Sequence, residues 1–206
     1  MEFLKYIDPA FLVATFGLVG VFVIVFAESG LFFGFFLPGD SLLFTAGLLA
    51  SQGHFSVIIL WIGCMLCAIL GDSVGYAFGK KVGPKIFFRE DSFFFHKKHI
   101  ERTRTFYEKY GKKTIVLARF VPIVRTFAPI LAGVGGMEYR TFISYNIIGG
   151  VGWSTLLIFL GFGLGSFIPS IDQYLLPIIL LIIVISFVPI AVEWIKSSKT
   201  SPQSDV

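Results

Sequence analysis

Six long apolar stretches dominate the sequence and restrict the chain to a membrane fold. They cover residues 11–27, 28–50, 57–79, 114–137, 141–165 and 174–195. Hydrophobic residues make up 55% of the chain and charged residues 15%, whereas a soluble domain carries about 45–50% and about 25%. One soluble core cannot bury that much apolar surface. The sequence therefore predicts an all-α integral membrane protein that forms a single domain over residues 1–206.

Two of the six stretches combine helix-breaking residues with charges. Residues 28–50 contain Glu28 and the run Pro38-Gly39-Asp40, and residues 114–137 contain Arg119, Pro122, Arg125 and Pro129. A proline inside a helix costs roughly 3 kcal/mol, and an ionised group at the bilayer centre costs about 2.5–3.5 kcal/mol. We therefore expect both stretches to form re-entrant helical hairpins, whose broken backbone is buried by protein or faces a watery cavity.

The basic segment at residues 80–113 sets the expected orientation. It carries eleven Lys or Arg and four acids, which predicts a cytoplasmic loop. Both termini then lie in the cytoplasm, and the hairpins enter from opposite sides, as in inverted-repeat transporters, with about four transmembrane helices. Six plain spans with two kinks give the same placement of the termini, so this alternative stays open. Within the loop, residues 92–110 predict an amphipathic surface helix, and residues 197–206 predict a disordered tail.

Glycine recurs every four residues in the third stretch, at Gly71, Gly75, Gly79 and Gly83. Such a smooth helix face predicts close packing against another helix. Asp72, beside the first of these glycines, can hydrogen-bond across that interface or line a polar path.

Four charges in the broken stretches carry the predicted chemistry: Glu28, Asp40, Arg119 and Arg125. Opposite signs in opposed hairpins suggest one central site. The planar fork of arginine suits phosphate, and helix N-termini suit an anion. A partly desolvated carboxylate takes up a proton at a higher pH than it does in water. Buried ion pairs that only fix the fold are the alternative.

Catalytic signatures are missing from the sequence, which shows no Ser-His-Asp set, Walker loop or metal cluster. The sequence therefore favours transport or lipid handling over an enzyme, and we expect neither a cofactor nor a metal.

Four motifs in order resemble the DedA family, the bacterial branch of membrane proteins with a VTT, or SNARE-associated, domain. They are ESGLFFGFFLPGD (28–40), GDSVGYAFG (71–79), RFVPIVRTFAPILAG (119–133) and GMEYRTFISYNIIGGVGW (136–153). The resemblance covers about residues 28–165. It implies two opposed re-entrant hairpins and the movement of lipid phosphates across the bacterial inner membrane.

By the motif match, Glu28 and Asp40 correspond to the family's functional acids, and Arg119 and Arg125 to its functional arginines. Six further residues fall inside the motifs and are candidates for a supporting role: Pro38, Gly39, Asp72, Tyr76, Asn146 and Trp153.

Three functions follow as hypotheses. The first is a flippase for undecaprenyl phosphate, or for an anionic phospholipid, in which the arginines hold the phosphate and the acids take up protons. The second is a proton-coupled antiporter of small cations that maintains the proton-motive force, and the third is a non-transporting assembly factor. A general phospholipid scramblase is a variant of the first. We expect no nucleic acid as a partner, and the sequence leaves homo-oligomer formation open.

Overall fold

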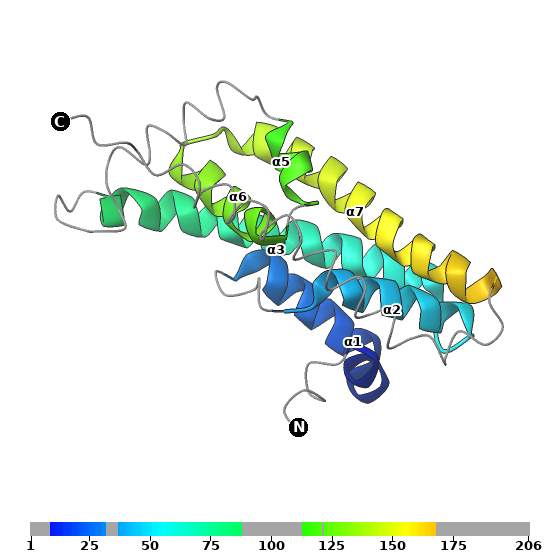
Figure 1. The fold of residues 1–206 in the computed structure, drawn as a ribbon. Helices are drawn as coiled ribbons and strands as arrows, with labels where there is room; N and C mark the ends of the chain where they lie inside the picture. The colour runs from blue at the N-terminus through cyan, green and yellow to red at the C-terminus, as the bar shows by residue number, and fades with distance from the viewer. Residues whose placement is uncertain (1–8, 32–36, 88–112, 121, 168–206) are drawn as a thin grey trace, which may run out of the picture.

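Six helices make up the described part of the chain, and no strand occurs among those residues (Figure 1). The structure, a computed structural model, describes residues 9–31, 37–87, 113–120 and 122–167. The helices are α1 (Pro9–Gly30), α2 (Gly39–Ser51), α3 (Val57–Phe87), α5 (Thr114–Ala118), α6 (Pro122–Val134) and α7 (Tyr139–Phe167). The predicted all-α fold is confirmed for these residues.

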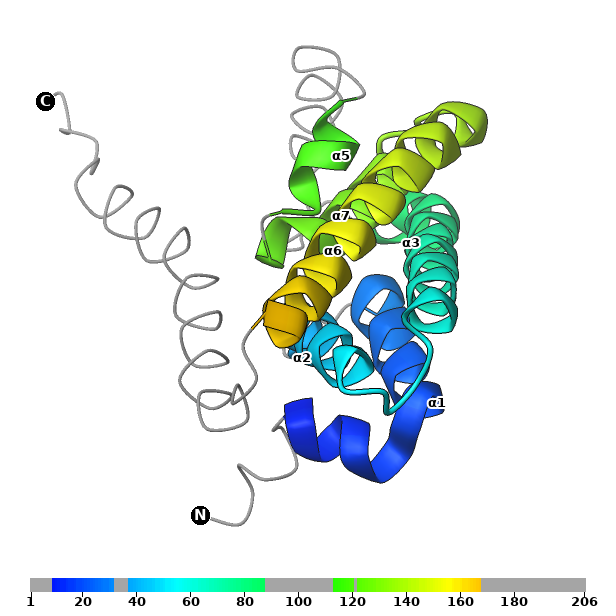
Figure 2. The ribbon, with the colours of Figure 1, turned by 90° about the vertical axis from the view of Figure 1, so that its right-hand side faces the viewer.

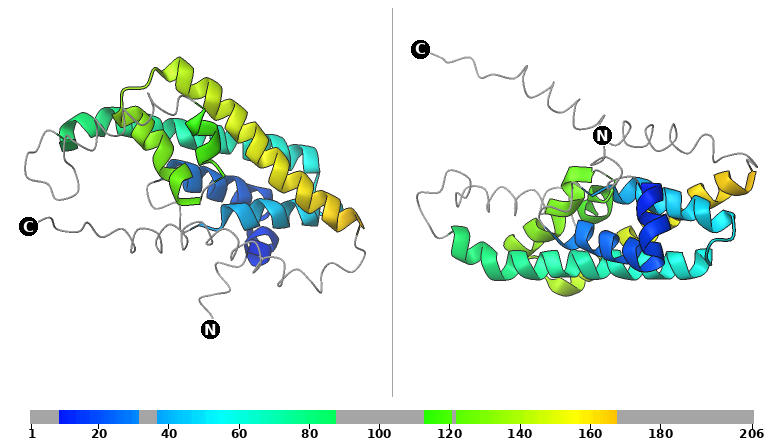
Figure 3. Two further views of the ribbon diagram at one scale, coloured as in Figure 1. Left: turned by 45° about the horizontal axis from the view of Figure 1, so that its top comes forward. Right: turned by 90° about the horizontal axis from the view of Figure 1, so that it is seen from below.

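Two of the helices are long and apolar enough to cross a membrane. They are Val57–Val82 within α3 and Tyr139–Phe167, which is α7. A helix needs about 20 apolar residues to cross the hydrocarbon layer, and these segments have 26 and 29. Only 28% and 33% of their most apolar windows are buried, so most of their side chains are available for contact with lipid. The two helices run side by side in opposite directions (Figures 1 and 3).

The first apolar stretch is not a straight span. Helix α1 continues past the expected end at residue 27 to Gly30, and it bends at Gly17, whose φ of 59° lies in the left-handed region that favours glycine. Figure 2 shows the two parts of α1 meeting at this bend. The apolar helical segment there, Thr15–Gly30, is shorter than a typical span.

Other boundaries also differ from expectation. Helix α3 continues to Phe87, so the first residues of the expected loop 80–113 are helical. The amphipathic helix predicted at 92–110, the last span at 174–195 and the tail at 197–206 lie outside the described residues.

Both stretches with interior prolines are interrupted, as expected. Helix α1 ends at Gly30 and α2 begins at Gly39, so Pro38 immediately precedes a helix. In the second stretch, α5 ends at Ala118 and α6 begins at Pro122. A proline at the first helical position costs little, because its missing N–H has no helical partner to lose.

Glycines bring α2 very close to α7. A Cβ atom on Gly47 would overlap the carbonyl oxygen of Ile158, and one on Gly161 would overlap the carbonyl oxygen of Phe44. The two backbones are therefore in direct contact, and α2 packs mainly on α7.

The crossing of α6 over α3 is built in the same way. A Cβ atom on Gly79 would overlap the carbonyl oxygen of Ile130, and one on Gly133 would overlap that of Tyr76. Helix α6 therefore packs mainly on α3. The predicted packing face on α3 is confirmed at Gly79, and also at Gly71, where a Cβ atom would press on the backbone of α1.

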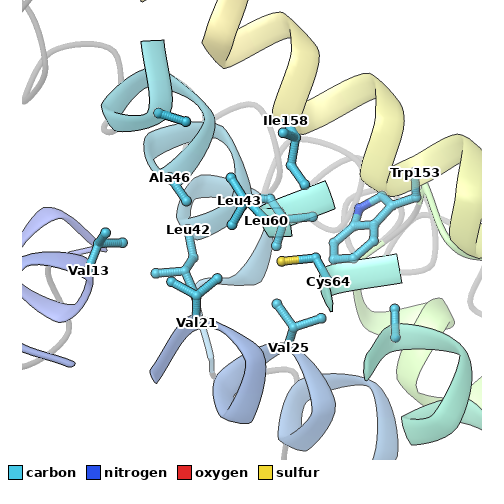
Figure 4. Close-up of a cluster of buried hydrophobic side chains, with 12 residues drawn as sticks. Val13, Val21, Val25, Leu42, Leu43, Ala46, Leu60, Cys64, Trp153 and Ile158 are labelled. Carbon is cyan, nitrogen blue, oxygen red and sulfur yellow. The ribbon is translucent and has the colours of Figure 1, made fainter. Parts of the chain in front are cut away.

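A cluster of buried apolar side chains holds four helices together (Figure 4). Its members include Val21 and Val25 of α1, Leu42 and Leu43 of α2, Leu60 and Cys64 of α3, and Trp153 and Ile158 of α7. Because every one of these side chains is at most 3% exposed, the cluster fixes the first half of α2 against its neighbours.

Candidate functional site

Arg125, the fourth residue of α6, binds two carboxylates. Its Nη1 donates a hydrogen bond to Oδ1 of Asp40 over 2.6 Å, and its Nη2 forms an ion pair with Oε1 of Glu28. Arg125 is 8% exposed and Glu28 is 2% exposed. Ion pairs that exclude water in this way are screened much less than pairs at a surface.

The carboxylates come from the two helices that flank the first interruption. Glu28 lies in the last turn of α1, and Asp40 lies in the first turn of α2. The backbone N–H of Gly39 donates a hydrogen bond to Oε1 of Glu28 over 3.3 Å. A Cβ atom at position 39 would overlap the Glu28 carboxylate, so glycine at this position lets the carboxylate reach the start of α2.

Trp153 of α7 completes this group. Its Nε1–H donates to Oδ1 of Asp40 over 2.8 Å, and Cζ of Arg125 lies 4.7 Å from the centre of its ring. The ring face therefore makes a cation–π contact while its edge holds the carboxylate. We call Glu28, Asp40, Arg125 and Trp153 the central cluster. Four different helices supply it.

A second group of buried polar side chains surrounds Arg119. Its Nη2 forms an ion pair with Oδ2 of Asp72 on α3 and donates to Oδ1 of Asn146 on α7 over 2.5 Å. It also approaches the carbonyl oxygen of Ala68 at 3.4 Å, and the Asn146 amide donates to the carbonyl oxygen of Ile69 over 3.0 Å. We call Asp72, Arg119 and Asn146 the flanking cluster. All three residues are at most 5% exposed.

The two clusters differ in charge balance. The flanking cluster pairs one arginine with one carboxylate, so its formal charges cancel. The central cluster has one arginine and two carboxylates, which leaves a formal charge of minus one when both acids are ionised. Asp40 is the more accessible of these acids, with 23% of its side chain exposed, against 3% for Glu28. The central cluster can therefore take up one proton and become neutral.

The structure divides the four predicted charges. It brings Glu28, Asp40 and Arg125 into direct contact, and it places Arg119 with Asp72 instead. The sequence did not reveal this pairing. A signal was present, because a single carboxylate inside an apolar span needs a partner.

The supporting candidates are also divided. Asn146 joins Arg119, whereas Trp153 joins the central cluster. The Pro38 carbonyl accepts hydrogen bonds from the hydroxyl group of Ser41 and from the N–H of Leu42 at the start of α2. Tyr76 lies in neither cluster.

Tyr76 has a packing environment of its own. Its hydroxyl group donates to the carbonyl oxygen of Met137, and its ring stacks on Phe142 with 4.6 Å between the ring centres. These contacts join α3 to Met137, just before α7, and to the first turn of α7.

No group of three or more His, Cys, Asp or Glu side chains that could hold a metal ion occurs within 9–31, 37–87, 113–120 and 122–167. The central cluster offers different chemistry. Its guanidinium is a donor for oxyanions, and its two acids can exchange protons.

Comparisons with known proteins agree with the motifs. The family model described as the VTT domain matches residues 37–163. The protein DedA of Escherichia coli K12 is 42% identical, with 99% of this chain and 96% of that protein covered. An uncharacterised membrane protein of Mycobacterium tuberculosis is 44% identical over 91% of this chain and 84% of its own length.

A more distant relative is the inner membrane protein YqjA of Escherichia coli K12, which is 32% identical over 79% of this chain and 77% of that protein. No solved structure matches the chain. The matched domain includes Asp40, both arginines and Trp153. The chain therefore belongs to the DedA family of VTT-domain membrane proteins.

Proposed function

We propose that this protein carries a lipid phosphate between the two leaflets of the bacterial inner membrane and couples the movement to protons. The favoured cargo is undecaprenyl phosphate. One observation carries the proposal: a buried arginine, Arg125, bridges two carboxylates at the point where α2 and α6 both begin. Such a group combines a donor for phosphate with acids that can exchange protons.

The proposed fold in the membrane is an inverted repeat. In it, the end of α1 with α2, and α5 with α6, form two re-entrant hairpins. Helices α2 and α6 have 13 residues each, about 20 Å of helix against a hydrocarbon layer of about 30 Å. They begin beside the same ion pair and run toward opposite ends of the molecule (Figure 1). The matching glycine crossings, α2 on α7 and α6 on α3, support the repeat.

The proposed roles follow from the contacts. Arg125 binds the phosphate, helped by the N-terminal dipoles of α2 and α6, and Glu28 and Asp40 carry the protons. Arg119 stays a predicted phosphate ligand, and to act as one it has to exchange Asp72 for the headgroup. Its Nε atom is buried and has no hydrogen-bond partner in the described part of the chain, so a donor is available for that exchange.

The orientation is proposed from charge. The eleven Lys and Arg residues in 80–113 put that segment in the cytoplasm, and both termini follow it. The proposed cargo makes anionic lipids and protons the expected partners. Formation of a homo-oligomer is a separate question for experiment.

The test is leaflet-resolved transport of labelled undecaprenyl phosphate in liposomes, with and without a pH gradient. We expect transport by wild-type protein and loss of it in Asp40→Asn and Arg125→Lys, because lysine keeps the charge and loses the fork. Arg140→Lys, the same change at an exposed position, is the matched control. Failure of the wild-type protein to move the lipid under any gradient would contradict the proposal.

The same variants separate the other hypotheses. A cation antiporter releases protons from vesicles when cations are added, without any need for phosphate lipids. The ion pairs argue against it, because a cation has to displace Arg125 from both acids. A scramblase moves ordinary phospholipids without a pH gradient. An assembly factor tolerates Arg125→Lys.

A further inference from the structure

The carboxylate of Glu28 occupies a place built for an anion. Its Oε1 atom accepts from the N–H of Gly39 at the start of α2 and pairs with the guanidinium of Arg125. A helix N-terminus and an arginine fork are the two kinds of donor that proteins use most readily for phosphate. Glu28 holds both donors while it is 2% exposed.

The fit of Glu28 to these donors is incomplete. Its second oxygen, Oε2, is buried and accepts no hydrogen bond within the described residues. A buried acceptor without a partner is costly. A phosphate has more oxygens to share among the same donors, and it carries the charge that the guanidinium requires. A phosphate group can therefore accept more hydrogen bonds at this position than the carboxylate of Glu28 does.

The charged and polar groups around Glu28 come from four helices, and protonation of Glu28 would change the charge at this place. Arg125 faces Glu28 from α6. From α2, the N–H of Gly39 donates to Glu28 itself, and Asp40 pairs with the same guanidinium as Glu28. Helix α3 packs against the end of α1 at Gly71. The acid next to this glycine, Asp72, is paired with Arg119. From α7, the ring of Trp153 covers Arg125.

We propose that Glu28 is a tethered substitute for the headgroup: its carboxylate and a phosphomonoester occupy the donors of Gly39 and Arg125 alternately. This rests on the proposed function and gives its coupling a physical basis. A proton that neutralises Glu28 releases both donors, and the incoming phosphate takes them. When the phosphate leaves, Glu28 loses its proton and returns, so that Arg125 always has an anion on the side of Glu28 in addition to Asp40.

The experiment measures binding to the purified full-length protein in detergent. The probes are farnesyl phosphate and inorganic phosphate, which separate a lipid headgroup from free phosphate. The variants are Glu28→Gln, which removes the charge and keeps the shape, and Glu138→Gln, the same change at an exposed acid. At about pH 8, above the second pKa of a phosphomonoester, Glu28→Gln should bind about tenfold or more tightly than wild type, a usual size for coupling between sites.

Glu138→Gln should bind as wild type does. Tighter binding of both probes by Glu28→Gln supports alternate occupancy in which the phosphate group alone is recognised. Tighter binding of farnesyl phosphate, without tighter binding of inorganic phosphate, supports alternate occupancy by a lipid headgroup. No gain with either probe overturns the inference. If Arg125→Lys still removes binding in that case, the proposed function survives without it. If no variant binds either probe, the proposed function fails as well.

A second measurement uses the wild-type protein and does not depend on the folding of a variant. Binding of farnesyl phosphate at about pH 8 should be accompanied by uptake of close to one proton per phosphate, measured calorimetrically in buffers of different ionisation enthalpy. Glu28→Gln should abolish this uptake. Binding without proton uptake by the wild type would refute the exchange.

Discussion

Replacing Asp72 by asparagine should lower the stability of the protein more than neutralising either of the two acids in the central cluster. Asp72 is the one carboxylate that pairs with Arg119 among the described residues, and the two side chains are 5% exposed. Asparagine keeps the size and an acceptor oxygen but removes the charge. Arg119 then stays buried without a counter-ion, and the amide of Asn146 cannot supply one.

The expected loss follows from the burial. Removing one partner of a buried ion pair costs about 3–5 kcal/mol. The amide oxygen of the new asparagine recovers about 1 kcal/mol through a hydrogen bond to Arg119. A net loss of about 2–4 kcal/mol lowers the Tm of a chain of this size by about 4–16 °C.

Asp40→Asn is the matched comparison. Its side chain is 23% exposed, and Arg125 keeps Glu28 as a counter-charge after the change. We expect a loss near the value of one hydrogen bond, about 1 kcal/mol, and a fall in Tm of about 2–4 °C. The two variants thus separate a pair that stabilises the fold from an acid that we propose carries protons.

The assay is thermal unfolding of the purified protein in detergent, followed by tryptophan fluorescence and by the fraction that stays monodisperse. Equal Tm values for Asp72→Asn and Asp40→Asn would refute the reasoning. The double variant Asp72→Leu with Arg119→Met provides a further check, because removing both charges together should cost less than removing Asp72 alone.

Three other predictions concern the backbone and Trp153. Gly79→Val should strongly reduce folded yield, because its side chain would overlap a carbonyl oxygen of α6. Gly152→Val should be tolerated, since nothing lies within 4 Å of a Cβ atom there. The two variants are compared by their expression and their monodispersity. Trp153→Phe should remove the hydrogen bond to Asp40 and keep a ring over the guanidinium, with a loss of about 0.5–1.5 kcal/mol in thermal unfolding. Gly17→Ala should cost about 1–3 kcal/mol, because the combination of φ 59° and ψ −156° is essentially restricted to glycine, and an unchanged Tm would contradict this.

The sequence predicted the interruptions well because their causes are local. Proline and glycine act on the backbone of their own turn, so the breaks before Gly39 and Pro122 were readable without a structure. A contact between Asp40 and Arg125 could be suspected for another reason: charges in apolar surroundings need partners of opposite sign, and few such partners exist in this chain.

The assignment of Arg119 needed three-dimensional information. Its partner Asp72 is 47 residues away in the chain, and no local pattern distinguishes it from Glu28 or Asp40 as a counter-ion. The pairing follows from how α3 and α7 lie beside Arg119, since they supply Asp72 and Asn146, and α6, which follows Arg119, contacts α3 closely at Gly79. The packing face was visible in the sequence, whereas the helix that would lie on it was not.

The two glycine crossings have a consequence for the proposed transport. Each fixes a short helix to a long helix of the other half of the chain, α2 to α7 and α6 to α3, and each leaves the N-terminal turn of the short helix at the central cluster. On the proposed inverted repeat, neither half holds a complete site, because Glu28 and Asp40 come from the first half and Arg125 comes from the second. A shift of the pair α2 and α7 against the pair α3 and α6 therefore has to change the contacts of Arg125, because Asp40 lies on α2 and Arg125 lies on α6. Such a shift is opposed while both carboxylates hold the guanidinium, and it becomes easier once a proton or a phosphate replaces one of those contacts.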